Sequence, residues 1–96
     1  MPETFWTVRW PDGTEDELYS PSTVIAQHFA AGDRHPLDAF VARARIALME
    51  ASARVEAKYG RPCSAAMGQL ARIEATAARQ PAGEVACLSL SEEPRS

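Results

Sequence analysis

The sequence predicts an α+β domain, with a small antiparallel sheet covered by helices in the order β-β-α-α-α-β. Two observations carry this prediction. Residues 4–10 and 15–20 flank the turn signal Pro11-Asp12-Gly13, as in a β-hairpin. Residues 36–80 form two amphipathic stretches joined at Gly60-Arg61-Pro62. A chain of 96 residues that is 46% hydrophobic supports one modest core. We therefore expect a single domain over residues 1–90 and a flexible tail over residues 91–96.

The N-terminal hairpin is predicted from residue type and alternation. Residues 4–10 are rich in aromatic and β-branched residues, and alternation places Trp6, Val8 and Trp10 on one face, opposite Phe5. Residues 15–20 are acidic, which favours the edge of a sheet. The last strand, residues 84–90, is expected to pair with the first. Alternation places its Ala86, Leu88 and Leu90 on one face.

Three helices are predicted between the strands. Ser20-Pro21 resembles a helix start, so a short helix is expected up to Phe29, followed by a loop over residues 30–36. In the long helix, residues 36–59, apolar residues recur every three or four positions: Leu37, Phe40, Val41, Ala44, Leu48, Ala51, Val55 and Tyr59.

The third helix follows a break at Gly60 and Pro62, and Cys63 or Ser64 is expected to cap it. We expect it to bury Met67, Leu70, Ala71, Ile73 and Ala77. Gly68 lies inside this helix, where glycine is unfavourable, so a close contact with a neighbouring element or a ligand is expected there.

Charge is unevenly distributed along the chain. The net charge is −3, yet residues 39–80 hold seven bases and three acids, between two acidic ends. We interpret this as internal charge complementarity, with a surface left for an acidic protein partner or an anionic ligand. The arginines are spread around two helices, which does not favour nucleic acid. The residues predicted to bind a partner or anion are Arg43, Arg45, Arg54, Arg61 and Arg72.

Little in the sequence indicates catalysis. Cys63 is the candidate for a reactive thiol, because Arg61 and a helix N-terminus would favour its thiolate; a capping or packing role is the alternative. No paired base is indicated, so we predict a protein that is not an enzyme, without catalytic residues or a cofactor. His28, His35, Cys63 and Cys87 lack the close spacing of zinc ligands, so no metal site is expected.

The residues also indicate a cytoplasmic protein. No run approaches the roughly 20 apolar residues of a transmembrane helix. The first ten residues do not have the pattern of a signal peptide. Two cysteines are too few for a disulfide framework, so free thiols are expected.

Three segments carry a resemblance to a known family: TFWTVRWPDGTEDELYSPS, DAFVARARIAL and YGRPCSAAMGQLARIEATAAR. From about residue 3 to residue 80 the chain resembles the small bacterial nitrogen starvation response proteins of the MSMEG type. This resemblance implies a gene cluster with a nitrilase, a radical SAM protein, an acetyltransferase-like protein, an AIR-synthase-like protein and a flavin-dependent oxidoreductase. It also implies a link to nitrogen limitation and to nitriles or cyanide as nitrogen sources. It implies no catalytic residues.

Three functions follow as hypotheses. The first is a non-catalytic accessory protein that binds a protein partner from the same gene cluster, with self-association into a homo-oligomer as the alternative. The second is an enzyme subunit or carrier that uses Cys63. The third is a regulator that binds nucleic acid.

Overall fold

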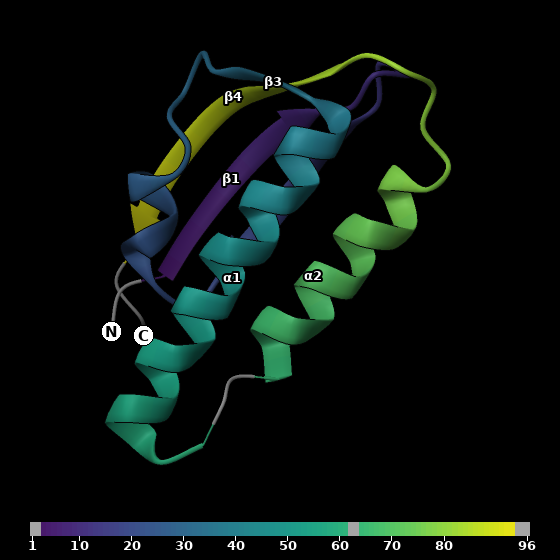
Figure 1. The fold of residues 1–96 in the computed structure, drawn as a ribbon. Coiled ribbons are helices and arrows are strands. Elements are labelled where there is room, and N and C mark those ends of the chain that lie inside the picture. The colour runs from purple at the N-terminus through teal and green to yellow at the C-terminus, as the bar shows by residue number, and fades with distance from the viewer. Residues whose placement is uncertain (1–2, 62–63, 94–96) are drawn as a thin grey trace.

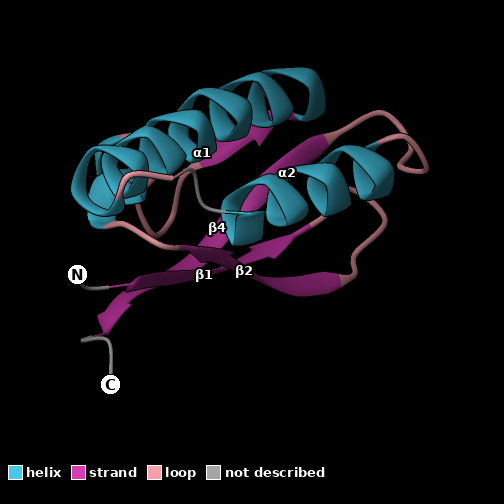
Figure 2. Cartoon of the chain, turned by 90° about the horizontal axis from the view of Figure 1, so that it is seen from below, coloured by secondary structure: helices cyan, strands magenta, loops and turns pink. Residues whose placement is uncertain are grey.

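The computed structural model describes residues 3–61 and 64–93. The elements are β1 (Glu3–Arg9), β2 (Glu15–Ser20), the 3-10 helix η1 (Thr23–Gln27), β3 (Arg34–Pro36), α1 (Leu37–Tyr59), α2 (Ser64–Ala77) and β4 (Glu84–Glu93). The strands form one antiparallel sheet in the order β2-β1-β4-β3. Both α-helices lie on one face of this sheet (Figure 1 and Figure 2). The predicted α+β class, the hairpin and the pairing of the last strand with the first are confirmed.

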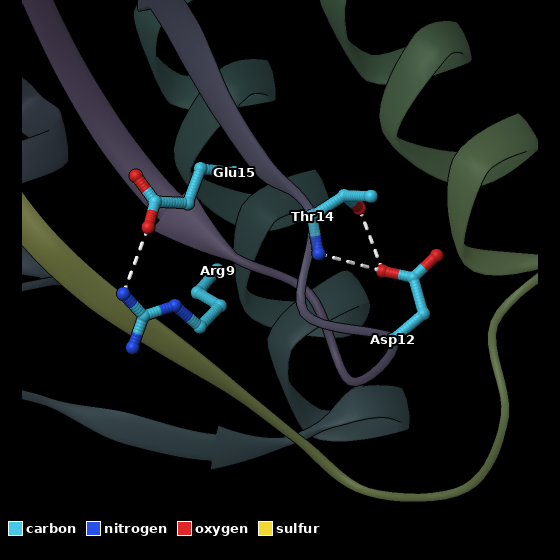
Figure 3. A network of polar contacts seen from close by, with 4 residues as sticks. All are labelled: Arg9, Asp12, Thr14 and Glu15. Atoms are coloured by element: carbon cyan, nitrogen blue, oxygen red, sulfur yellow. Dashed lines mark hydrogen bonds and ion pairs between the residues drawn. The ribbon is translucent and has the colours of Figure 1, made fainter.

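The β1–β2 turn is stabilised by its own side chains. Gly13 has a φ of 90°, in the left-handed region that favours glycine. The backbone N–H and the hydroxyl of Thr14 both donate to Asp12 Oδ1, at 2.9 and 2.6 Å (Figure 3). Beside the turn, Arg9 and Glu15 are register partners joined by an ion pair of 2.7 Å. β2 lies at the edge of the sheet, as its acidic residues predict.

β4 contains a bulge opposite β1. Thr7 pairs with Ser89, but the next residue of β1, Val8, pairs with Cys87. Leu88 is therefore an extra residue in β4, which shifts the register by one from that point.

The bulge changes the face on which Leu90 lies. Leu90 pairs with Trp6 and packs against the core, whereas Leu88 is 36% exposed. The prediction that both leucines share one face is wrong, because strict alternation does not allow for an inserted residue. β4 also continues to Glu93, past the expected end of the strand at Leu90. Residues 94–96 of the predicted tail lie outside the described residues.

Strand β3 lies where a loop was predicted. It pairs with residues 84–86 of β4, and just beyond it the Cys87 N–H donates to the Asp33 carbonyl at 2.8 Å. Because β3 is an edge strand, Pro36 can occupy its last position without leaving a ladder hydrogen bond unmade. Three residues are too few to produce a periodic signal in the sequence.

The short helix differs from its prediction in type and in start. It is a 3-10 helix, and its N-cap is Ser22, whose hydroxyl accepts a hydrogen bond from the Val24 N–H at 3.3 Å. Ser20 was predicted to cap it, but Ser20 lies in β2 and its hydroxyl donates to the Ser22 carbonyl at 3.0 Å. A serine engaged in the turn after β2 does not act as the helix cap.

α1 matches the predicted long helix at both ends. It follows Pro36, and Gly60 ends it with a φ of 84° and an N–H that donates to the Glu56 carbonyl at 2.8 Å. Tyr59 was predicted to continue the buried stripe but is 52% exposed, because the last turns of α1 project past the end of the sheet (Figure 1). The buried residues of α1 are Phe40, Ala44, Ala47, Leu48, Ala51, Ser52 and Val55.

α2 begins at Ser64, so Ser64 is the first residue of the helix, and the other predicted cap, Cys63, lies outside the described residues. Leu70 and Ile73 are buried as predicted. Ala71 was predicted to be buried but is exposed, since it lies about 100° around the helix from Leu70.

Gln69 is the buried polar residue of α2. Its side-chain oxygen accepts a hydrogen bond from the Tyr19 N–H at 3.1 Å, which ties α2 to β2. Gly68, one residue earlier, is exposed, and a Cβ there would meet nothing within 4 Å. The predicted close contact of Gly68 with a neighbouring element is therefore wrong.

The core is centred on aromatic rings from β1 and from the segments that cover it. Trp6 stacks on Phe29 with 6.0 Å between the ring centroids, and the ring centroids of Phe29 and Phe40 are 5.3 Å apart. Trp10 meets Phe40 edge-on at 5.5 Å. Alternation along β1 predicts this burial of Trp6 and Trp10, and both are at most 2% exposed. No helix in the described part of the chain is long and apolar enough to span a membrane.

Candidate functional site

The five arginines predicted to bind a partner do not form one surface. Arg45 of α1 pairs with Glu74 of α2, and Arg72 of α2 pairs with Asp16 of β2 at 3.5 Å. These two arginines therefore join α1, α2 and β2, as internal charge complementarity predicts.

Arg43 and Arg54 lie on the side of α1 that faces away from Arg45. They are eleven residues apart, which is close to three helical turns, so both lie on the same side of α1. Neither has a carboxylate partner among the described residues. Arg61 is exposed beyond the end of α1. Cys63, the candidate thiol two residues later in the sequence, lies outside the described residues.

A hollow of about 370 Å³ opens beside Arg43. It lies between α1 and the segment that carries η1 and β3. Its lining residues are His28, His35, Ala39, Ala42, Arg43 and Ile46.

Both histidines that line the hollow contact other side chains of the protein. His28 Nε2 lies 3.2 Å from Glu50 Oε1. The His35 ring meets Phe29 edge-on at 5.5 Å. The side chain of His35 is only 20% exposed because β3 places it beside the core. Its Nε2 is buried and lies 3.7 Å from Asp33 Oδ2, too far for a hydrogen bond, and it has no hydrogen-bond partner within the described residues.

An exposed apolar stripe on α1 is the feature that the sequence reasoning missed. Ile46 is 54% exposed and Met49 is 53% exposed, the highest exposures among the large hydrophobic side chains described. They lie on the side of α1 opposite the core, together with exposed alanines. The signal was present in the spacing, which alternates between three and four: Ala39, Ala42, Ile46, Met49 and Ala53. The stripe borders the hollow, because Ala39, Ala42 and Ile46 belong to both.

The face of the sheet that the helices leave open is mainly polar. Its largest apolar groups are Phe5 and Tyr19, whose rings lie 5.5 Å apart across β1 and β2 and are half-buried. Thr7 and Glu17 are register partners next to this pair. Leu88, at the bulge of β4, is a further large apolar side chain that lies away from the core.

The ionisable side chains around the hairpin stabilise the fold. Asp12 holds the turn, Glu15 pairs with Arg9 and Asp16 pairs with Arg72. The hydrogen bonds from the Thr14 hydroxyl and N–H hold the pKa of Asp12 below its ordinary value.

The described cysteine is poorly suited to nucleophilic chemistry. Burial, together with the nearby charge of Asp33, raises the pKa of Cys87 to about 11, so the thiol stays protonated at neutral pH. Within residues 3–61 and 64–93, no group of three or more His, Cys, Asp or Glu side chains is placed to hold a metal ion.

Comparison with known proteins gives one match to a protein family. A family model described as "Nitrogen starvation-induced protein NitG" matches residues 5–90. No curated protein and no solved structure matches the chain.

Proposed function

Because the chain belongs to the NitG family of nitrogen starvation-induced proteins, we propose that it is a non-catalytic accessory protein that acts by binding another protein. The partner is an enzyme of the same nitrogen response, encoded in the nitrile- or cyanide-type assimilation cluster that the resemblance implies. The docking surface is the outer side of α1, defined as the exposed stripe, the hollow beside it and Arg43 with Arg54.

The exposure of Ile46 and Met49 carries this proposal. Each leaves more than half of its side chain in water on the ridge of a helix, next to a hollow. Exposed apolar side chains that cluster beside a concave surface are typical of protein-interaction sites. Burying them against a partner supplies the free energy, while Arg43 and Arg54 on the rim select a partner with carboxylates opposite them.

The distribution of the other groups supports binding in preference to catalysis. In the described residues the thiol of Cys87 is buried, and His28 is engaged by Glu50. Two of the five arginines are neutralised within the protein, so the exposed cations of the helices do not form the basic stripe that nucleic acid selects.

The test is calorimetric titration of each co-encoded enzyme into this protein. We expect one of them to bind, and the Ile46→Ala/Met49→Ala variant to bind it at least about tenfold more weakly. An Arg43→Ala/Arg54→Ala variant loses about two- to tenfold, since rim charges contribute less. Arg79→Ala, an exposed arginine near the end of α2, is the matched control. Unchanged binding by the Ile46/Met49 variant would overturn the assignment of the surface.

A further inference from the structure

α1 is apolar on two opposite sides, and only one of them is covered. The side toward the sheet is filled by buried residues such as Phe40, Ala44 and Leu48. The opposite side carries the exposed stripe of Ala39, Ala42, Ile46, Met49 and Ala53. Figure 2 shows that α1 lies above the strands, so one of its sides faces away from the sheet. A surface helix normally has one apolar side, so the second stripe indicates a contact outside the chain.

We propose that a second copy of this chain covers the stripe, with the two α1 helices packed antiparallel about a twofold axis between Ile46 and Met49. This inference rests on the proposed function, because it uses the same outer side of α1, and it adds a regulatory consequence. The alternating three- and four-residue spacing is the heptad pattern of paired helices. A twofold axis lets one patch serve both copies.

The antiparallel register fits the sizes of the stripe residues. With Ile46 opposite Met49 of the second copy, the two large side chains from each helix fill the centre of the contact. Ala42 then lies opposite Ala53 of the second copy, and small residues at both ends allow the helices to approach closely. α1 is 23 residues long, so the contact is available over several turns.

Charge complementarity favours this occupant and this direction. In the antiparallel register Arg43 lies beside Glu50 of the second copy, and the symmetry makes this pair twice. Arg43 has no carboxylate partner among the described residues. Glu50 contacts His28 through Oε1, which leaves Oε2 able to accept another hydrogen bond.

The parallel alternative is less well matched. It would place Glu50 of the second copy beside Arg45 instead of Arg43. Arg45 is already engaged by Glu74 in the same chain. A parallel pair would place Asp38 of the second copy beside Arg43, but it would also have to break or share the existing ion pair between Arg45 and Glu74.

Self-association would regulate the docking surface. A protein partner that presents a carboxylate to Arg43 occupies the position that Glu50 of the second copy would take. Partner binding and pairing then exclude each other, so the apparent affinity for the partner falls as the concentration of this chain rises.

Charge reversal tests the inference by sedimentation equilibrium. We expect the native chain to show a concentration-dependent monomer–dimer equilibrium. Arg43→Glu and Glu50→Arg each weaken it by about tenfold or more, and the double reversal restores it to within about threefold. Arg79→Glu is the control and leaves it unchanged. Circular dichroism checks that each variant is folded.

Three outcomes overturn the inference: a monomer at every concentration, single reversals without effect, or a double reversal that fails to restore pairing. Direction is tested separately by mixing an Ile46→Cys variant with a Met49→Cys variant under oxidised glutathione. The antiparallel register predicts the mixed disulfide between positions 46 and 49, and a disulfide between two copies of position 46 contradicts it. If the protein is monomeric and still binds a co-encoded enzyme through Ile46 and Met49, this inference fails while the proposed function stands.

Discussion

Trp6 of β1 lies directly opposite Leu90 of β4, on the face of the sheet that the helices cover. This pairing depends on the extra residue at Leu88, which shifts the register of β4 between Thr7 and Val8. Without the bulge, Leu90 would point to the open face and Trp6 would lose an apolar neighbour. The bulge thus decides which of the two leucines contributes to the core.

Replacing the two leucines of β4 should have unequal effects. Leu90→Ala is expected to lower the free energy of unfolding by about 1–2 kcal/mol, less than a fully buried leucine because Leu90 is only partly buried. Leu88→Ala should change it by less than about 0.5 kcal/mol. Urea unfolding followed by tryptophan fluorescence measures both. Equal losses would contradict the assignment of Leu90 to the core face.

The contact between Trp10 and Phe40 predicts a larger loss. Phe40 is fully buried and its ring meets Trp10 edge-on. Phe40→Leu should therefore destabilise the protein by about 2 kcal/mol, from lost packing and the lost aromatic pair. Tyr59→Leu, at an exposed position of the same helix, is the matched control and should remain within about 0.5 kcal/mol of the native value. A thermal melt by circular dichroism distinguishes the two.

The two glycines around the helix junction should respond in opposite directions to alanine. Gly60 has a φ of 84°, so Gly60→Ala is expected to cost about 1 kcal/mol of stability. Gly68 lies inside α2, with open space where a Cβ would be, so Gly68→Ala should stabilise by about 0.5–1 kcal/mol. The midpoint of urea unfolding measures the stability change of each variant. A destabilising Gly68→Ala would show that a neighbour or ligand approaches that position.

The turn held by Asp12 predicts a pH dependence. Hydrogen bonds from Thr14 lower the pKa of Asp12 in the folded protein, so Asp12 contributes stability above its unfolded pKa of about 3.9. That contribution is lost as the pH falls through the lowered folded pKa. Asp12→Ala should therefore be less stable than the native chain at pH 7, and the difference should shrink at low pH.

Nuclear magnetic resonance titration tests the cause of the lowered pKa. Thr14→Val removes the hydroxyl donor and should move the pKa of Asp12 back toward its ordinary value. Asp16, which is not bonded to Thr14, serves as the internal control. A pKa of Asp12 that does not change in this variant would contradict the role of the hydroxyl.

The environment of Cys87 predicts slow thiol chemistry. Its pKa of about 11 and its 1% exposure leave little reactive thiolate in the folded protein. Iodoacetamide at pH 8 should leave Cys87 unmodified until denaturant is added, when mass spectrometry detects the adduct. Rapid labelling of Cys87 in the folded protein would show that β4 opens.

Much of the fold could be predicted because the decisive signals are local. The turn at Asp12-Gly13, the alternation of Trp6 and Trp10 and the stop at Gly60 each act within a few residues. The candidate site was only partly predictable. Charge along the sequence identified both Arg43 and Arg45 as binding residues. Only the structure shows that Glu74 of another helix neutralises Arg45.

By itself the sequence determined the fold class, the ends of α1 and the tryptophans of the core, because backbone stereochemistry and the period of apolar residues depend on near neighbours. Only the tertiary structure decided the bulge at Leu88, strand β3 and the partners of the arginines, since each depends on residues distant in the chain. It also decided which of two apolar stripes on α1 is the core. Both stripes have helical spacing, and the sheet covers one of them while Ile46 and Met49 stay in water.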